Sequence, residues 1–103
     1  MTVRHIVSWK MNGETAEDRE RQLAEIEEAL EGLPALVPGV LSFDLRRNDY
    51  NADANWDLVL VSEHVDKDAL DAYAVHPDHL VAVAIVRERV AARACVDFEI
   101  LNP

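Results

Sequence analysis

The sequence has little cysteine, little glycine and no long apolar run. The single cysteine, Cys95, cannot form an internal disulfide, which fits a reducing cytoplasm. Three glycines leave no glycine-rich loop of the kind that cradles phosphates, which argues against a nucleotide cofactor. No apolar stretch approaches the ~20 residues that a membrane-spanning helix needs. The opening "MTVRHIVSWKMN" has charges within it and no small-residue cleavage site, so we expect no signal peptide.

Basic residues are also scarce, because ten lysines and arginines face twenty acidic residues, for a formal charge of −10. Such a surface repels phosphate backbones and anionic lipid, so we expect neither a nucleic acid nor a membrane partner. Half of the residues are hydrophobic, which excludes a disordered chain. A length of 103 residues predicts one domain, 1–103, with one core.

Hydrophobic periodicity predicts alternating strands and helices. Thr15 should open a helix that ends near Glu31, before Gly32 and Pro34. The stretch "LVAVAIV" is ambiguous, but Pro77 and Asp78 before it favour a helix that continues through "RERVAA". The predicted strands are 3–11, 40–48, 56–64 and 94–101, with a turn at Pro38-Gly39 and a second helical region that Asp66 opens over 67–75.

This order predicts an α+β fold of the ferredoxin-like, split βαβ type, with a four-stranded antiparallel sheet and helices on one face. The third strand is apolar on both faces, with Leu58 and Leu60 on one and Val59 and Val61 on the other. Because the helices cover only one face, we expect a homodimer that packs sheet against sheet. The sequence leaves open which of the two faces meets the partner.

The segment "YAVHPDH", residues 73–79, gathers two of the four histidines around a proline. His76 precedes Pro77 and should end one helix, so His79 falls in the first turn of the next. A helix N-terminus disfavours added positive charge and would keep His79 neutral, as a general base must be. Tyr73 could then hold an oxyanion. The alternative is structural, with His76 as a cap and His79 as a hydrogen-bonded buried side chain.

His5 lies on an apolar strand face, and Asp97 is its natural partner, since the first and last strands are neighbours in this fold. The contact would either be structural or orient the imidazole. We expect His64 to be exposed and Cys95 to act as a small strand hydrophobe. His76 and His79 lack the spacing of metal ligands on one helix, so we expect no metal and no cofactor.

The segments "HIVSWKM", "VPGVLSFDLRRN", "WDLVLVSEH", "YAVHPDH" and "VDFEI", in this order, resemble the stress-response A/B barrel (Dabb) family. The resemblance implies a dimeric α+β barrel, and most members have no assigned function. One plant member closes a polyketide ring by a cofactor-free aldol condensation, and the wider superfamily includes cofactor-independent monooxygenases. The residues of that cyclase's pocket fall on His5, Tyr73, His76, His79 and Asp97.

Three hypotheses of function follow. The protein binds a small hydrophobic molecule; or it is a cofactor-free cyclase or monooxygenase with His79 as base, assisted by Tyr73 and His5; or it is a structural, stress-associated dimer without a ligand site. The first two require His5, Tyr73 and His79 to converge on a pocket between the sheet and the second helical region.

Overall fold

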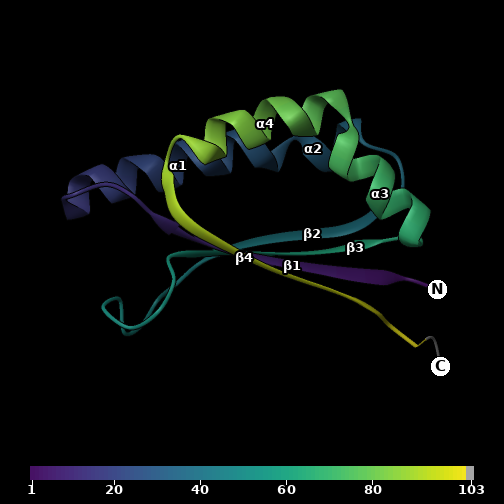
Figure 1. Cartoon of the computed structure of the whole chain (residues 1–103), viewed down its shortest axis with the longest axis horizontal. Helices are drawn as coiled ribbons and strands as arrows, with labels where there is room; N and C mark the ends of the chain where they lie inside the picture. Colours follow the sequence, from purple (N-terminus) through teal and green to yellow (C-terminus); the bar gives the residue numbers. More distant parts are fainter. Residues whose placement is uncertain (102–103) are drawn as a thin grey trace.

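The computed structural model describes residues 1–101 as one sheet covered on one face by helices (Figure 1). The elements are β1 (Val3–Met11), α1 (Ala16–Glu31), α2 (Leu33–Leu36), β2 (Val40–Arg47), β3 (Leu58–His64), α3 (Lys67–Val75), α4 (Pro77–Arg87) and β4 (Val90–Glu99). The strands are antiparallel in the order β2-β3-β1-β4. The predicted ferredoxin-like α+β fold is therefore confirmed.

Local signals place the helices as the sequence predicted. The Thr15 hydroxyl accepts a hydrogen bond from the Asp18 amide at the start of α1, and the Asp66 carboxylate accepts one from the Ala69 amide at the start of α3. The turn before β2 has Gly39 at φ 85°, where a Cβ would also lie 2.8 Å from the Cβ of Ala69. Only glycine fits both the backbone and this close approach.

Several boundaries differ from the prediction, and the last strand, expected over 94–101, spans Val90–Glu99. The helix α4 ends at Arg87 and does not continue through "RERVAA", because the Arg89 amide bonds to the Val86 carbonyl in a turn and β4 begins at Val90. Pro34 lies within the short helix α2, where a loop was expected. The strand β3 begins at Leu58, because the Asp57 carboxylate accepts a hydrogen bond from the Met11 amide.

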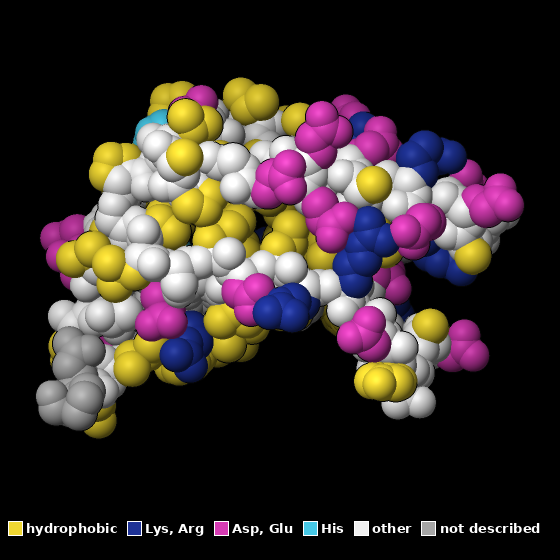
Figure 2. Space-filling view, turned by 180° about the vertical axis from the view of Figure 1, so that it is seen from behind, with side chains coloured by type: hydrophobic (Ala, Val, Ile, Leu, Met, Phe, Trp, Pro, Cys, Tyr) yellow, Lys and Arg dark blue, Asp and Glu magenta, His cyan; other side chains and the backbone are white. Residues whose placement is uncertain are grey.

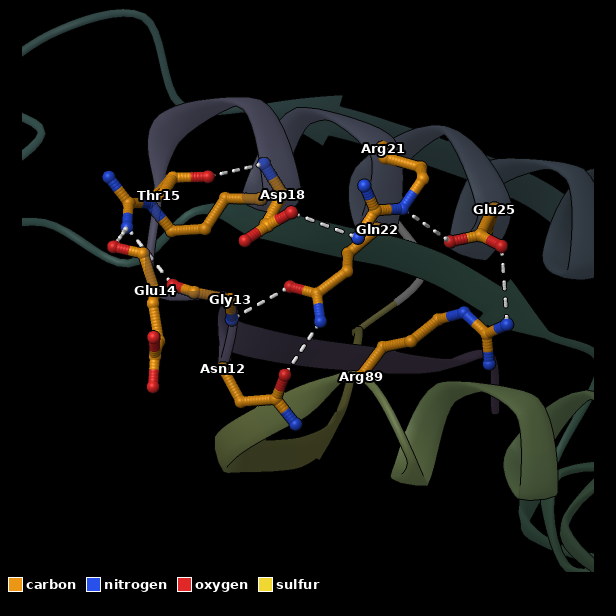
Figure 3. A network of polar contacts seen from close by, with 10 residues as sticks. Asn12, Gly13, Glu14, Thr15, Asp18, Arg21, Gln22, Glu25 and Arg89 are labelled. Atoms are coloured by element: carbon orange, nitrogen blue, oxygen red, sulfur yellow. Dashed lines mark hydrogen bonds and ion pairs between the residues drawn. The ribbon is translucent and has the colours of Figure 1, made fainter.

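A polar network joins the β1–α1 turn to the end of α4 (Figure 3). The side chain of Gln22 accepts from the Gly13 amide at 2.9 Å and donates to the Asn12 side chain at 2.6 Å. The Asn12 amide reaches the Arg89 carbonyl at 2.9 Å, and the Arg89 guanidinium pairs with Glu25 of α1. These bonds hold α1 and α4 over one end of the sheet.

The two faces of the sheet have different surroundings. Every second residue of the central strands, such as Val7 of β1 and Leu58 and Leu60 of β3, is buried beneath the helices. The opposite face is bare in Figure 1, and an apolar patch lies on it, which we call the outer patch: Ile6, Val59, Val61, Val96 and Phe98.

Charge and apolarity are distributed unevenly over the rest of the molecule. Acidic side chains gather over the end of the molecule where α1 lies (Figure 2).

Within residues 1–101, no single helix is long and apolar enough to cross a membrane. The pair α3 and α4 passes that test only when the two are taken together, and they are bent by 63° at their junction.

Candidate functional site

A cavity of about 470 Å³ lies between the sheet and α4. Most of its wall is apolar. His5 and His79 contribute their imidazoles to the wall, and Tyr73 contributes its phenol. The three side chains therefore meet at one cavity, as the sequence predicted. The other lining residues are Val7, Trp9, Leu30, Leu60, Ala74, Leu80, Val83, Val86, Arg87, Val90 and Arg93.

His5 and Asp97 are directly opposite each other on β1 and β4, and His5 Nδ1 is hydrogen-bonded to Asp97 Oδ1. The predicted pairing is thus confirmed in geometry. A carboxylate on Nδ1 fixes the tautomer, because Nδ1 then carries the proton and Nε2 keeps its lone pair. The imidazole is buried while the carboxylate is half-exposed. Whether the pair orients His5 for chemistry remains a prediction.

Tyr73 is the central ring of an aromatic cluster. It is 2% exposed, and its ring centroid lies 4.3 Å from that of His79, 4.9 Å from that of His64 and 6.3 Å from that of His5. Burial raises the pKa of Tyr73 to about 12, so the phenol keeps its proton near neutral pH. Tyr73 is therefore a hydrogen-bond donor for an oxygen atom in the cavity.

His79 of α4 is held in one orientation by two residues of the preceding helix α3, Ala74 and Tyr73. Its Nδ1 donates to the Ala74 carbonyl at 3.0 Å, which leaves Nε2 as the nitrogen that can accept a proton. Burial is the largest cause that lowers the pKa of His79. The hydrogen bond to the Ala74 carbonyl opposes it, and the neighbouring His5, Arg93 and His76 side chains lower the pKa further. The imidazole is thus neutral near pH 7. A neutral His79 was predicted from its place at the helix N-terminus, whereas burial is the largest cause in the structure.

His64 was expected to be exposed, and this is wrong. It is 0% exposed, and its Nε2 lies 3.0 Å from the Ser62 hydroxyl oxygen, also fully buried. The alternation of β3 places Leu58, Leu60, Ser62 and His64 on the helix-covered face. The same alternation was visible in the sequence and could have predicted this burial.

His76 does not line the cavity. Its Nδ1 accepts a hydrogen bond from the Asp78 amide at 3.1 Å, so it caps the start of α4. This contact matches the structural alternative for His76. Its junction with Pro77 nevertheless sets the bend that brings His79 against Tyr73.

Three side chains of types that can bind a metal lie close together around His5. Donor atoms of His5, Cys95 and Asp97 lie within 4.8 Å of one another, so they are the described residues that could hold a cation. From the sequence, His76 and His79 were the candidates weighed for this role, and Cys95 was expected to act as a small strand hydrophobe. Burial raises the pKa of Cys95, which favours the thiol over the metal-binding thiolate.

Replacing His64 should weaken the pH dependence of stability. Burial lowers the pKa of His64 below its ordinary value of 6.5, and its Nδ1 has no hydrogen-bond partner within residues 1–101. Below about pH 6.5 the unfolded chain therefore binds a proton that the folded chain does not, so stability falls as the pH falls through this window. Urea unfolding of the unsubstituted protein at pH 7.5 and 5.5 should show that loss.

The His64→Gln variant should lose less stability than the unsubstituted protein over the same interval. His76→Gln is the control, because it removes an imidazole that is partly exposed, whereas that of His64 is fully buried. An identical pH dependence in His64→Gln and the unsubstituted protein would show that His64 does not carry this linkage.

The fold and the cavity define a ferredoxin-like α+β protein with a largely apolar chamber beneath its helices. Residues 3–100 match the family described as "Stress responsive A/B Barrel Domain". The chain belongs to this family.

Similar proteins agree with that assignment. An uncharacterized protein of Streptomyces coelicolor is 31% identical over 97 residues, which cover 94% of this chain and 98% of that protein. A dimeric ferredoxin-like protein of unknown function from Bacteroides fragilis is 33% identical over 96% of both chains, with a TM-score of 0.85. Another dimeric ferredoxin-like protein, from Thermobifida fusca, is 31% identical over 97% of this chain and 92% of that one, with a TM-score of 0.80.

Proposed function

We propose that the protein binds a small hydrophobic molecule in the cavity between the sheet and α4. The observation that carries this proposal is a chamber of about 470 Å³ whose wall is mainly apolar and whose polar groups include His5, Tyr73 and His79. Ligand sites of this volume commonly combine an apolar wall with a few polar groups that fix orientation. The Tyr73 hydroxyl has no hydrogen-bond partner within the residues that the structure describes, so it is available to a ligand.

Filling the cavity should abolish binding. Val83 lines the cavity from α4, whereas Val81 on the same helix is 64% exposed and does not line it. Val83→Trp should remove binding of a neutral apolar probe, 2-naphthalenemethanol, in a fluorescence titration, because the indole occupies the probe's volume. Val81→Trp is the matched control and should bind as the unsubstituted protein does. Equal binding by both variants would place the probe elsewhere.

A homodimer through the outer patch is part of the proposal. The similar proteins from Bacteroides fragilis and Thermobifida fusca are described as dimeric. In this chain the outer patch includes Val96 at 61% and Phe98 at 41% exposure, which a partner's sheet would cover. We expect the contact to bury at least ~1,200 Å² in total, the lower end for stable interfaces.

A second function is supported by the state of His79. A neutral imidazole with a fixed Nδ1 proton, packed against a protonated phenol, suits proton abstraction next to a carbonyl. His79 Nε2 would take the proton, and the Tyr73 hydroxyl would donate a hydrogen bond to the developing oxyanion. His5 would join it in its protonated form, in which Nε2 also carries a hydrogen. Such chemistry would make the protein a cofactor-free enzyme, of the cyclase or monooxygenase kind.

The third hypothesis, a structural dimer without a ligand site, is the least favoured. It does not account for a chamber into which three titratable side chains project. A cytoplasmic location remains part of the proposal, on the ground that the lone Cys95 has no partner for an internal disulfide.

A further inference from the structure

Two arginines line the cavity, Arg87 at the end of α4 and Arg93 on β4. Neither forms an ion pair with a carboxylate within residues 1–101. This differs from most of the basic side chains, because six of the ten pair with Asp or Glu: Arg4, Arg21, Arg46, Arg47, Lys67 and Arg89. In a chain with twice as many acids as bases, two cations without an acidic partner at one cavity point to an anion from outside.

The strand alternation places Arg93 on the face of β4 that lines the cavity. It lies opposite Trp9 of β1, on the same helix-covered face as Cys95 and Asp97. Its positive charge contributes to the lowered pKa of His79 and partly offsets the rise that burial causes in the pKa of Cys95. Asp97, on the same face of β4, is bonded to His5.

The rest of the wall offers almost no partner for a charged ligand. Between the arginines and the aromatic cluster the wall is formed by aliphatic and indole side chains: Val7, Trp9, Leu30, Leu60, Val83 and Val86. A ligand that satisfies the whole cavity therefore has an apolar body and one anionic group. Guanidinium forks match a planar carboxylate through two parallel hydrogen bonds.

We propose that the ligand of this cavity is an apolar carboxylic acid whose carboxylate is held by Arg87 and Arg93. This inference rests on the proposed binding function and adds the class of molecule. The apolar body lies against α4 and the sheet, and the aromatic cluster is left to meet a carbonyl or hydroxyl on the same molecule. A charge-assisted hydrogen bond typically contributes enough free energy for about a tenfold change in affinity.

The test compares an acid with its neutral counterpart on one ring system. The unsubstituted protein is titrated by fluorescence with 2-naphthoate and with 2-naphthalenemethanol, which differ in the charged group. We expect 2-naphthoate to bind about tenfold tighter, and expect the difference to shrink at high salt. In Arg93→Gln and in Arg87→Gln/Arg93→Gln the preference for the acid should fall or vanish, while affinity for the alcohol stays the same.

Arg21→Gln is the matched control, because it removes the same charge from an exposed helical position outside the cavity, and it should leave both affinities unchanged. Unchanged binding of the alcohol also shows that each variant has folded with its cavity intact. Equal affinity for acid and alcohol in the unsubstituted protein would overturn the carboxylate inference and leave the binding function standing. Binding of neither probe would overturn the binding function itself. A preference for the acid that survives in the double variant would show that the arginines do not hold it.

Discussion

Val61→Asp should convert the proposed dimer into a folded monomer. Val61 lies on the bare face of β3, paired in register with Ile6 of β1 and with Asp44 of β2. Two-fold symmetry places one new carboxylate on each subunit, so both would be buried between the sheets beside an existing acid. An uncompensated buried charge costs several kcal/mol, enough to dissociate an interface of ordinary size. Light scattering after size exclusion should then report the monomer mass, with unchanged helical circular dichroism.

The adjacent residue provides the contrast. Leu60 is 2% exposed and lies in the core beneath the helices, so Leu60→Asp should unfold the subunit itself. Its circular dichroism should lose the native helical signal. If Val61→Asp remains a dimer, or if the unsubstituted protein is a monomer at every concentration, the sheet-to-sheet contact is not the interface.

His79→Ala should reduce proton transfer by about 10²-fold or more, the usual contribution of a general base. A suitable reporter is 2-acetonaphthone in D₂O, because abstraction of a proton next to its carbonyl exchanges the methyl hydrogens for deuterium, which proton NMR follows. The substitution leaves the Tyr73 hydroxyl in place as the donor to the oxyanion and removes only the proton acceptor, His79 Nε2. Binding of 2-naphthalenemethanol should be retained.

His76→Ala is the control for this experiment, since His76 lies three residues away and outside the cavity. It should lose only the capping contribution to stability, about 1 kcal/mol, and keep the exchange rate. Exchange that is as fast in His79→Ala as in the unsubstituted protein, or absent from both, would favour a binding protein without turnover.

Strand parity accounts for most of what the sequence could predict. Alternation placed His5 and Asp97 on one face, and neighbouring strands made their contact predictable. The same rule, carried further, would have buried His64, which was interpreted by its polar type and not by its position in the alternation. Arg93 was missed for another reason, because the last strand was predicted to begin only at residue 94.

Other features depend on interactions that no local pattern contains. The segment "RERVAA" has good helix formers, but Val90 and Ala92 pair with Met11 and Lys10 of a strand almost eighty residues earlier, and that pairing overrides propensity. Both faces of β3 are apolar, so only the position of the helices shows that Val59 and Val61 face outward. The cavity itself is the space left between packed elements, which periodicity cannot reveal.

The pairing of the first strand with the last determines when this site can exist during synthesis. β1 lies in the middle of the sheet, and β4 at its edge carries Cys95 and Asp97. His5 leaves the ribosome early, but its partner Asp97 lies 92 residues later. The imidazole therefore cannot be oriented by Asp97 until almost the whole chain has been synthesised. Closing so long a loop is entropically slow and comes late in folding. Nascent chains that stop before β4 would expose the edge of β1 that β4 covers. The strand β4, ten residues long, therefore both completes the site and covers an edge that could otherwise pair with another chain.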